Sequence, residues 1–177
     1  MQYINRYTSP IGKITMASDG EALTGLWFDG QKYFALYLDK DNEEKDLPIF
    51  DMAKKWLDIY FSGKEPNFKL PLKFTGSEFQ NEVWEILYAI PYGKTVTYGE
   101  IAKELANRRG IGKMSAQAVG GAVGKNEISI IVPCHRVVGS NGSLTGYAGG
   151  IDKKISLLKL EKAYNEKFIV PKHSTAP

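Results

Sequence analysis

The hydrophobic pattern of the chain changes its period near residue 75, and this change limits the folds that the chain can adopt. Before residue 75 the apolar residues lie in short β-rich runs separated by the turn sequences SPIG and SDGE, at 1–8, 12–18 and 22–28. After it they recur every three to four positions, as in short helices. The sequence therefore predicts an α+β chain with two differently built domains, residues 1–75 and 76–177.

The first domain is expected to combine an antiparallel sheet with one helix. In DMAKKWLDIYFSGK, residues 51–64, four apolar residues recur at helical spacing, Ala53, Trp56, Leu57 and Tyr60. Gly63 is expected to end this helix. The stretch KEPNFKLPLKFTG, at 64–76, contains two prolines and little periodicity. It is predicted to be a linker.

Composition narrows the class of protein. The 177 residues, 43% hydrophobic and 24% charged, can bury a core in one domain or in two small ones. We find no targeting sequence and no apolar run of membrane-spanning length, so a cytoplasmic protein without membrane contact is expected. With one cysteine and two histidines, His135 and His173, the chain cannot form an internal disulfide and lacks the ligands of a zinc site, so we expect no metal and no cofactor.

The charge is distributed unequally between the two halves. Residues 1–75 carry a formal net charge of −1, and residues 76–177 carry +4. The second half is therefore better suited to a polyanion such as DNA, although a solvated basic face gives the same count.

Two capping boxes open successive helices in the second domain. SEFQ at 77–80 and TYGE at 97–100 each place a hydroxyl three residues before an amide or acid that can satisfy free backbone N–H groups. A third helix is expected from Ser115, and GSNGSLTGYAGG at 139–150 is a candidate for a hairpin. Helices followed by a hairpin predict a winged helix-turn-helix, which is a DNA-binding architecture.

The third helix is rich in glycine. In SAQAVGGAVGKN, residues 115–126, each glycine costs about 1 kcal/mol of helix propensity relative to alanine. Close approach of the helix backbone to another surface would explain this cost. That surface is either a neighbouring helix in the core or the sugar-phosphate backbone of a nucleic acid, and the segment alone leaves both open.

A final helix is expected from about Asp152. It places Glu161 on its apolar side, four and three residues after Leu157 and Leu158. A buried carboxylate in this position needs a partner, and a histidine would serve.

The stretch IVPCHR, residues 131–136, places the only cysteine, Cys134, directly before a histidine. A lone cysteine at the end of an apolar run is usually an inert buried thiol. Here Pro133 restricts the backbone, His135 can accept a proton, and the charge of Arg136 favours thiolate. On a strand His135 would point away from Cys134, so it can serve the thiol only if the backbone turns or a water relays the proton.

These residues resemble the active-site motif of the O6-alkylguanine-DNA alkyltransferases, also called methylated-DNA-protein-cysteine methyltransferases. PCHRV at 133–137 is similar to the motif itself, and SAQAVGGAVGKN resembles the family's recognition helix. GYAGG at 146–150 resembles the segment that closes over the base, and residues 9–28 resemble the opening of a ribonuclease-H-like N-terminal domain. The resemblance extends to about residue 164.

The resemblance implies repair by direct alkyl transfer. The protein would bind duplex DNA, rotate an O6-alkylguanine out of the stack and transfer the alkyl group to Cys134 in a single turnover. His135 is implied to be the base, acting through a water, and Glu161 to orient it. Tyr98 is implied to be the donor to the guanine, and Asn126 to support the turn between the recognition helix and the active site.

The resemblance also implies which residues contact DNA. Those expected to face the duplex are Ser115, Ala116, Gln117, Ala118, Gly120, Gly121 and Arg136. Those expected to hold the flipped base are Val137, Tyr147, Ala148 and Gly149. Gln117 departs from the pattern, because some members of the family carry an arginine there that fills the gap left by the base. Arg108 and Arg109 precede the recognition helix and are candidates either for phosphate contact or for a solvated face.

Two other functions stay open on the residues alone. A cysteine hydrolase would use a Cys-His pair, but it needs an oxyanion hole and normally has its histidine far from the cysteine in sequence. A winged-helix regulator or a non-catalytic lesion binder would bind DNA without chemistry, and the presence of Cys134 argues against the lesion binder. We expect a monomer whose partner is duplex DNA containing O6-alkylguanine. Repair of O4-alkylthymine and the role of residues 165–177 stay open.

Overall fold

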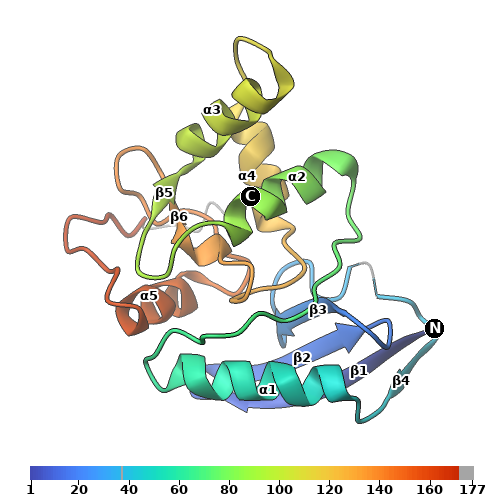
Figure 1. Cartoon of the computed structure of the whole chain (residues 1–177). Helices are drawn as coiled ribbons and strands as arrows, with labels where there is room; N and C mark the ends of the chain where they lie inside the picture. The colour runs from blue at the N-terminus through green and yellow to red at the C-terminus, as the bar shows by residue number, and fades with distance from the viewer. Residues whose placement is uncertain (37, 172–177) are drawn as a thin grey trace. The chain divides into compact units, whose positions relative to one another are not determined.

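The computed structural model of the 177-residue chain describes residues 1–36 and 38–171, so His173 lies outside the described residues (Figure 1). The chain forms two compact units. The first contains Met1–Thr75 together with the short segment Glu127–Ser129, and the second contains Gly76–Asn126 and Ile130–Pro177.

The first unit is built on a four-stranded sheet of order β3-β2-β1-β4. Its strands are β1 (Gln2–Ser9), β2 (Gly12–Ser18), β3 (Leu23–Phe28) and β4 (Asn42–Glu44). The first three strands form the predicted antiparallel meander, in which Tyr7 lies opposite Ile14. β4 was not predicted from the sequence, because a three-residue strand that pairs in parallel with β1 leaves no periodic signal.

Helix α1 (Pro48–Phe61) packs against β1 and β2 of this sheet (Figure 1). It begins three residues before the predicted start, because Pro48 is tolerated in the first turn, where no intrahelical N–H donor is needed. Its buried face consists of Ile49, Phe50, Ala53, Leu57 and Tyr60. Trp56 is half-buried and stacks on Tyr60, with ring centroids 5.3 Å apart.

The free edge of β3 is covered by two short segments from elsewhere in the chain. The N–H of Leu23 donates to Pro71 O at 2.8 Å, so the predicted linker is bound to the sheet over this part. The N–H of Leu26 donates to Glu127 O at 2.8 Å, and Leu26 O accepts from Ser129 N at 2.9 Å. These bonds satisfy backbone groups that an open edge strand would expose.

The second unit is mainly helical and contains a two-stranded parallel pair. Its elements are α2 (Glu78–Tyr88), β5 (Val96–Thr97), α3 (Tyr98–Arg109), α4 (Ala116–Gly124), a 3-10 turn (Cys134–Arg136), β6 (Val137–Val138) and α5 (Ile151–Leu160). Both predicted capping boxes are present, Ser77 with Gln80 and Thr97 with Glu100. The indole N–H of Trp84 on α2 donates to Ala122 O on α4 at 2.9 Å, which ties these two helices together.

The hairpin predicted over 139–150 is not formed. Gly139 N donates to Ser143 O at 2.8 Å, which closes a tight turn, but Ser143 then bridges to Ile169. Leu144 N donates to Ile169 O and Ile169 N to Gly142 O. The second arm of the wing is therefore supplied from residue 169, and this pairing could not be predicted because the sequence pattern reports only local contacts.

Among the residues that the structure describes, no helix has both the length and the apolar character needed to span a bilayer.

Candidate functional site

Cys134 opens a single 3-10 turn that continues through His135 and Arg136. Arg136 N donates to Pro133 O at 3.0 Å, so the backbone reverses here and does not continue as a strand. The alternation that would separate the side chains of Cys134 and His135 therefore does not apply. Cys134 is 5% exposed and His135 is fully buried.

Glu161 follows the last residue of α5 and binds two side chains of this turn. Its Oε2 lies 2.6 Å from Nε2 of His135, and both side chains are fully buried. Its Oε1 accepts from Nε of Arg136 at 2.8 Å and from Gly93 N at 3.1 Å. The carboxylate thus has donors on both oxygens, as a buried charge requires.

These contacts decide the protonation states of the pair. Burial alone would raise the pKa of Glu161, but the hydrogen bonds and charges of His135 and Arg136 outweigh burial and hold that pKa well below its usual range. Burial lowers the pKa of His135, and the bond to Glu161 offsets only part of this effect. An ionised Glu161 requires the hydrogen on Nε2 of His135, which leaves Nδ1 as the basic nitrogen of a neutral imidazole.

The thiol of Cys134 is in its protonated form at rest. Burial raises its pKa, while a hydrogen bond from the Asn126 side chain and the charge of Lys154 act in the opposite direction. Asn126 is buried as well, and its Nδ2 donates to Val132 O at 2.8 Å. Asn126 therefore contacts the acceptor thiol and also fixes the backbone just before it.

Tyr98 is the first residue of α3, directly after the capping residue Thr97. Its hydroxyl donates to Thr145 O at 3.1 Å. Burial and the nearby Cys134 raise the pKa of Tyr98 to about 12, so the phenol keeps its proton at neutral pH and can act as a donor.

Helix α4 exposes the residues that the sequence analysis assigned to DNA. Ser115 caps the helix, accepting from Ala118 N at 3.2 Å, and it is exposed together with Ala116, Gln117 and Ala118. Gly120 and Gly121 are half-buried, and the opposite face is buried through Val119, Ala122 and Val123. A Cβ on Gly121 would meet nothing within 4 Å, and one on Gly120 would meet only the Tyr98 ring, at 3.9 Å. Packing within the chain therefore does not require a glycine at either position.

Two family models match the chain, the ribonuclease-like domain of 6-O-methylguanine DNA methyltransferase over residues 3–74 and its DNA binding domain over residues 78–163. The chain belongs to the 6-O-methylguanine DNA methyltransferase family.

Relatives support this assignment along most of the chain. The methylated-DNA–protein-cysteine methyltransferase of Methanosarcina acetivorans is 45% identical over 160 residues, covering 90% of this chain and 97% of the relative. That of Haemophilus influenzae is 40% identical over 161 residues, covering 90% and 86%. The crystal structure of Mycobacterium tuberculosis OGT in complex with DNA is 42% identical with a TM-score of 0.77, covering 91% and 93%. The predicted family, fold class and activity, transfer of a methyl group from DNA to a protein cysteine, are thereby confirmed.

Within this methyltransferase fold Arg136 does not lie where the sequence analysis expected it. It is 7% exposed, binds Glu161, donates to Ile90 O at 2.7 Å and lies over the Tyr92 ring at 5.6 Å. The burial of its guanidinium in contacts within the chain argues against the predicted contact between Arg136 and DNA, which stays a prediction.

Arg108 and Arg109 are also engaged by carboxylates. Arg108 Nε lies 3.0 Å from Glu104, and Arg109 NH2 lies 3.0 Å from Glu82. Of the two interpretations that the sequence left open, these ion pairs favour a solvated face over phosphate contact.

Of the residues predicted to hold the base, Val137 and Tyr147 lie next to the turn at Cys134. Val137, in β6, is fully buried and directly follows the turn. Tyr147 is buried, and its ring meets that of His135 edge to face at 6.5 Å. Ala148 and Gly149 are half-buried in the loop before α5.

One residue of the site was missed by the sequence analysis. Lys154, in α5, is fully buried, and its Nζ donates to Val137 O at 2.6 Å and to Thr145 O at 3.1 Å. A signal was available, because Lys154 precedes Leu157, Leu158 and Glu161 by three, four and seven residues and so shares their buried face.

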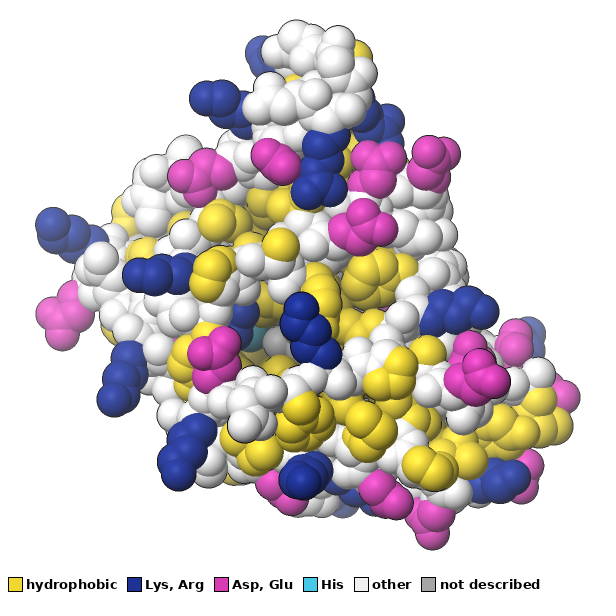
Figure 2. Space-filling model, viewed as in Figure 1, with side chains coloured by type: hydrophobic (Ala, Val, Ile, Leu, Met, Phe, Trp, Pro, Cys, Tyr) yellow, Lys and Arg dark blue, Asp and Glu magenta, His cyan; other side chains and the backbone are white. Residues whose placement is uncertain are grey.

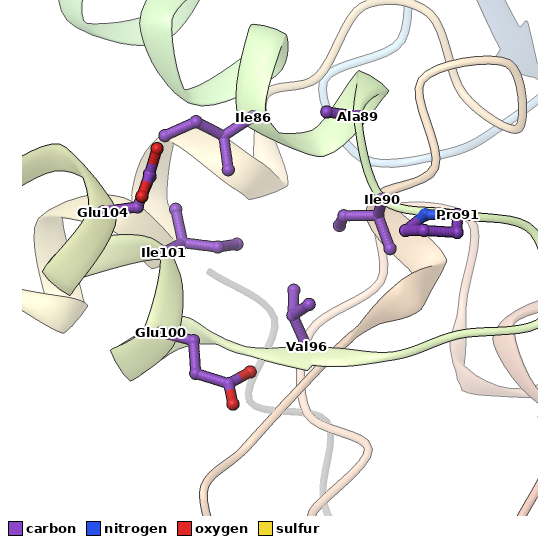
Figure 3. Close-up of a pocket in the computed structure, with 8 residues that line it drawn as sticks. All are labelled: Ile86, Ala89, Ile90, Pro91, Val96, Glu100, Ile101 and Glu104. Carbon is purple, nitrogen blue, oxygen red and sulfur yellow. The ribbon is translucent and has the colours of Figure 1, made fainter. Parts of the chain in front are cut away.

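A separate apolar pocket of about 240 Å³ lies where α2, β5 and α3 meet (Figure 3). Ile86, Ile90, Val96 and Ile101 point into it, and Glu100 and Glu104 stand at its rim. Carboxylates at the rim repel phosphate, so this pocket does not have the chemistry of a DNA site. On the face of the molecule shown in Figure 2, basic and acidic side chains are mixed.

Proposed function

We propose that Cys134 accepts the alkyl group of an O6-alkylguanine in duplex DNA, once per protein molecule, and keeps it as a permanent thioether. The observation that supports this proposal is the turn at Cys134, in which a buried thiol directly precedes a buried His135 whose Nε2 lies 2.6 Å from Glu161 Oε2. This arrangement supplies a nucleophile, a base and a group that orients the base.

The first chemical step is the transfer of the thiol proton. His135 is neutral at rest and receives the Cys134 proton on Nδ1 through a water, and Glu161 stabilises the imidazolium that results. The thiolate then attacks the alkyl carbon in line with the C–O6 bond. A new S–C bond forms as the C–O6 bond breaks, and its electron pair passes to the guanine.

The leaving guanine must be relieved of negative charge. Tyr98 is protonated, since its pKa is about 12, and its hydroxyl supplies a hydrogen bond or a proton to the guanine ring as the oxygen is released. Its present acceptor, Thr145 O, lies in the segment that leads to the base-holding residues Tyr147 and Ala148. Binding of the base therefore exchanges one acceptor of the Tyr98 hydroxyl for another.

Duplex DNA is recognised by helix α4 and the groove beside it. The exposed residues Ser115 to Ala118 and the half-buried Gly120 and Gly121 offer a face without bulky side chains, on which the sugar-phosphate backbone can approach the helix closely. A groove of about 640 Å³ between α3 and the start of α4 is lined by Lys103, Asn107, Lys113 and Ser115. Lys103 and Lys113 are exposed and suit phosphate contact better than the paired Arg108 and Arg109.

Gln117 is proposed to enter the stack where the base leaves it. It is exposed on the first turn of α4. As a short uncharged side chain it is a weak wedge, which suffices for an alkylated pair that is already poorly matched and costs less to open.

The two parts of the chain divide this work. We assign the DNA interface and the alkyl acceptor to residues 76–177, and a supporting ribonuclease-like domain to residues 1–75. The protein is proposed to act as a monomer in the cytoplasm, where a thiol stays reduced.

The test is single-turnover removal of the methyl group from duplex DNA containing one O6-methylguanine. The wild-type protein should clear at most one lesion per molecule, and Cys134→Ser should clear none while binding the same duplex with similar affinity. Repeated turnover would indicate a hydrolase, and removal of the methyl group by Cys134→Ser would contradict the assignment of the acceptor.

A further inference from the structure

Arg136 is a buried arginine at the end of the 3-10 turn. Its Nε donates to Glu161 Oε1 at 2.8 Å, and its Nη1 donates to Ile90 O at 2.7 Å. The guanidinium also lies over the Tyr92 ring, 5.6 Å from the ring centroid. Because a guanidinium is planar and its donors have a fixed geometry, these contacts hold Arg136 in one orientation.

The carboxylate of Glu161 is shared between two side chains, one on each oxygen. Oε1 accepts from Arg136 and from Gly93 N at 3.1 Å, and Oε2 lies 2.6 Å from Nε2 of His135. Since two donors hold Oε1, the carboxylate is fixed with Oε2 directed at the imidazole. This keeps the hydrogen on Nε2 and leaves Nδ1 as the basic nitrogen, which the proposed transfer of the thiol proton requires.

The charges of this group decide whether His135 is protonated. A guanidinium stays charged throughout the pH range in which proteins fold, so the charges of Arg136 and Glu161 already balance each other. A proton on His135 would place two cations beside one carboxylate. His135 is fully buried, and an unbalanced charge is costly in a medium of low dielectric constant. The contacts of Arg136 therefore favour a neutral imidazole.

Titratable and charged groups face His135 from three segments. They are Cys134 and Arg136 from the turn, Lys154 and Glu161 from α5 and its C-terminal end, and Tyr147 from the loop before α5. Burial lowers the pKa of His135, the bond to Glu161 opposes this shift, and the charges of Arg136 and Lys154 add to it. The Nζ of Lys154 is held by two backbone carbonyls, whereas Arg136 binds the same carboxylate as His135. Arg136 thus competes directly with His135 for the charge of Glu161.

We propose that Arg136 is a positioning residue for alkyl transfer, which fixes Oε1 of Glu161 and balances its charge, so that His135 stays neutral until it takes the thiol proton. The proposal deepens the proposed function and rests on it for the role of His135 as the base. Arg136 gives up no proton and forms no bond to the alkyl group. It sets the lower end of the pH range in which Cys134 and His135 hold one transferable proton between them.

The test is a nitrogen-15 NMR titration of the histidine side chains in DNA-free protein. The chain has two histidines, and His173→Asn identifies the signals of His135. Arg136→Met removes the charge but keeps a long apolar chain, and it should raise the titration midpoint of His135 by at least about one pH unit. Arg136→Lys keeps the charge and should stay closer to wild type. Arg6→Met, in an exposed arginine 4.0 Å from Glu44, is the matched control and should not change the midpoint.

Three results would overturn the proposal. The first is a charged His135 in wild type at neutral pH, which needs no variant and counts even if every Arg136 variant fails to fold. The second is a His135 that stays neutral over the same pH range in Arg136→Met as in wild type. The third is an equal shift in Arg136→Met and Arg136→Lys, which would assign Arg136 to packing alone.

Methyl transfer gives a second readout. The rate of transfer from O6-methylguanine duplex falls at low pH as His135 takes a proton, and in Arg136→Met this fall should move to higher pH with the NMR midpoint. Weaker DNA binding with a smaller salt dependence in Arg136→Met, and an unchanged midpoint, would instead assign Arg136 to phosphate contact and overturn the proposal. The NMR titration is made without DNA, so a failure of the proposed function, seen as no methyl transfer by wild type, is distinguishable from a failure of this inference.

Discussion

At the scale of single residues, the resting site holds its acceptor as a thiol. Burial raises the pKa of Cys134, and it lowers the pKa of His135, so the neutral form is favoured for both groups. Glu161 stays charged, because it binds Arg136 and His135 at 2.8 and 2.6 Å. We therefore expect the thiolate and the imidazolium to form only when an alkyl group is present. A permanent thiolate would be open to oxidation, and this arrangement avoids it.

Tyr98 is expected to contribute to the rate but not to be indispensable. Tyr98→Phe keeps the ring and removes the donor, so single-turnover transfer from O6-methylguanine duplex should slow by about 100-fold, the low end for loss of a general acid. Tyr164→Phe, in a residue outside the site whose ring packs edge to face on Phe168, serves as control. A wild-type rate in Tyr98→Phe would show that the guanine leaves without this donor.

Residue types in a local motif were the easiest part of the site to predict. Cys134, His135 and Glu161 lie together as expected, because the cysteine and histidine are adjacent and Glu161 interrupts an apolar helix face. The direction of Arg136 could not be predicted, since a turn of three residues decides whether it points to solvent or to Glu161. Lys154 shares the helix face of Glu161, but the sequence analysis did not assign it to the site, and lysine is rarely buried.

At the scale of elements, helix α4 contains glycine at a position where the fold has room for a larger residue with higher helix propensity. Gly121 has helical backbone geometry and open space where a Cβ would lie. Glycine lowers the helix propensity here, and packing within the chain does not require it. Such a glycine indicates a helix surface without side chains, which a partner can approach closely.

Gly121→Ala should therefore separate stability from DNA binding. The substitution is expected to stabilise the fold by about 0.5–1 kcal/mol in chemical denaturation. It should also weaken binding to duplex DNA on the order of tenfold, or about 1.4 kcal/mol, because the methyl group lies between the helix and the phosphate backbone. Met52→Ala, on an exposed position of α1, controls for effects unrelated to the interface. A gain in stability with unchanged DNA affinity would remove Gly121 from the interface.

Elements with local signals were predicted well, and those that depend on distant partners were not. Both capping boxes open helices where the sequence places them, because each box is complete within four residues. The wing was predicted as a hairpin of 139–150, whereas its pairing partner is Ile169. The short strand β4 and the pairing of Pro71 and Lys73 with Leu23 likewise depend on contacts that no local pattern reports.

At the scale of the whole molecule, three residues between helix α4 and Cys134 belong to the first unit, although the residues before and after them belong to the second. Glu127–Ser129 belongs to the first unit, where Glu127 Oε2 accepts from Thr75 Oγ1 at 2.7 Å. Glu127 is 3% exposed, and neither its Oε1 nor the nearby Thr24 Oγ1 has a hydrogen-bond partner among the described residues. Burial raises the pKa of Glu127 to about 7, with Thr75 opposing the shift.

This carboxyl should make stability depend on pH. The folded state keeps the proton up to about pH 7, whereas the unfolded chain loses it near its ordinary value of 4.5, so stability falls as pH rises between these values and is flat above them. Glu127→Gln should stabilise the protein by about 1–2 kcal/mol at pH 8 and have little effect at pH 5. Denaturation at both pH values measures this, with Glu65→Gln, an exposed carboxyl of the same unit, as control. An equal effect at the two pH values would rule out ionisation of Glu127 as the cause.

The central claim is that Cys134 itself becomes the product of the reaction. It is tested most directly by mass spectrometry of the intact protein after mixing with an excess of duplex DNA containing one O6-methylguanine, followed by peptide mapping. The account predicts a gain of one methyl group per protein molecule, located on Cys134 and not exceeded at longer times. A protein of unchanged mass that still binds the lesion, or a methyl group on any other residue, would contradict it.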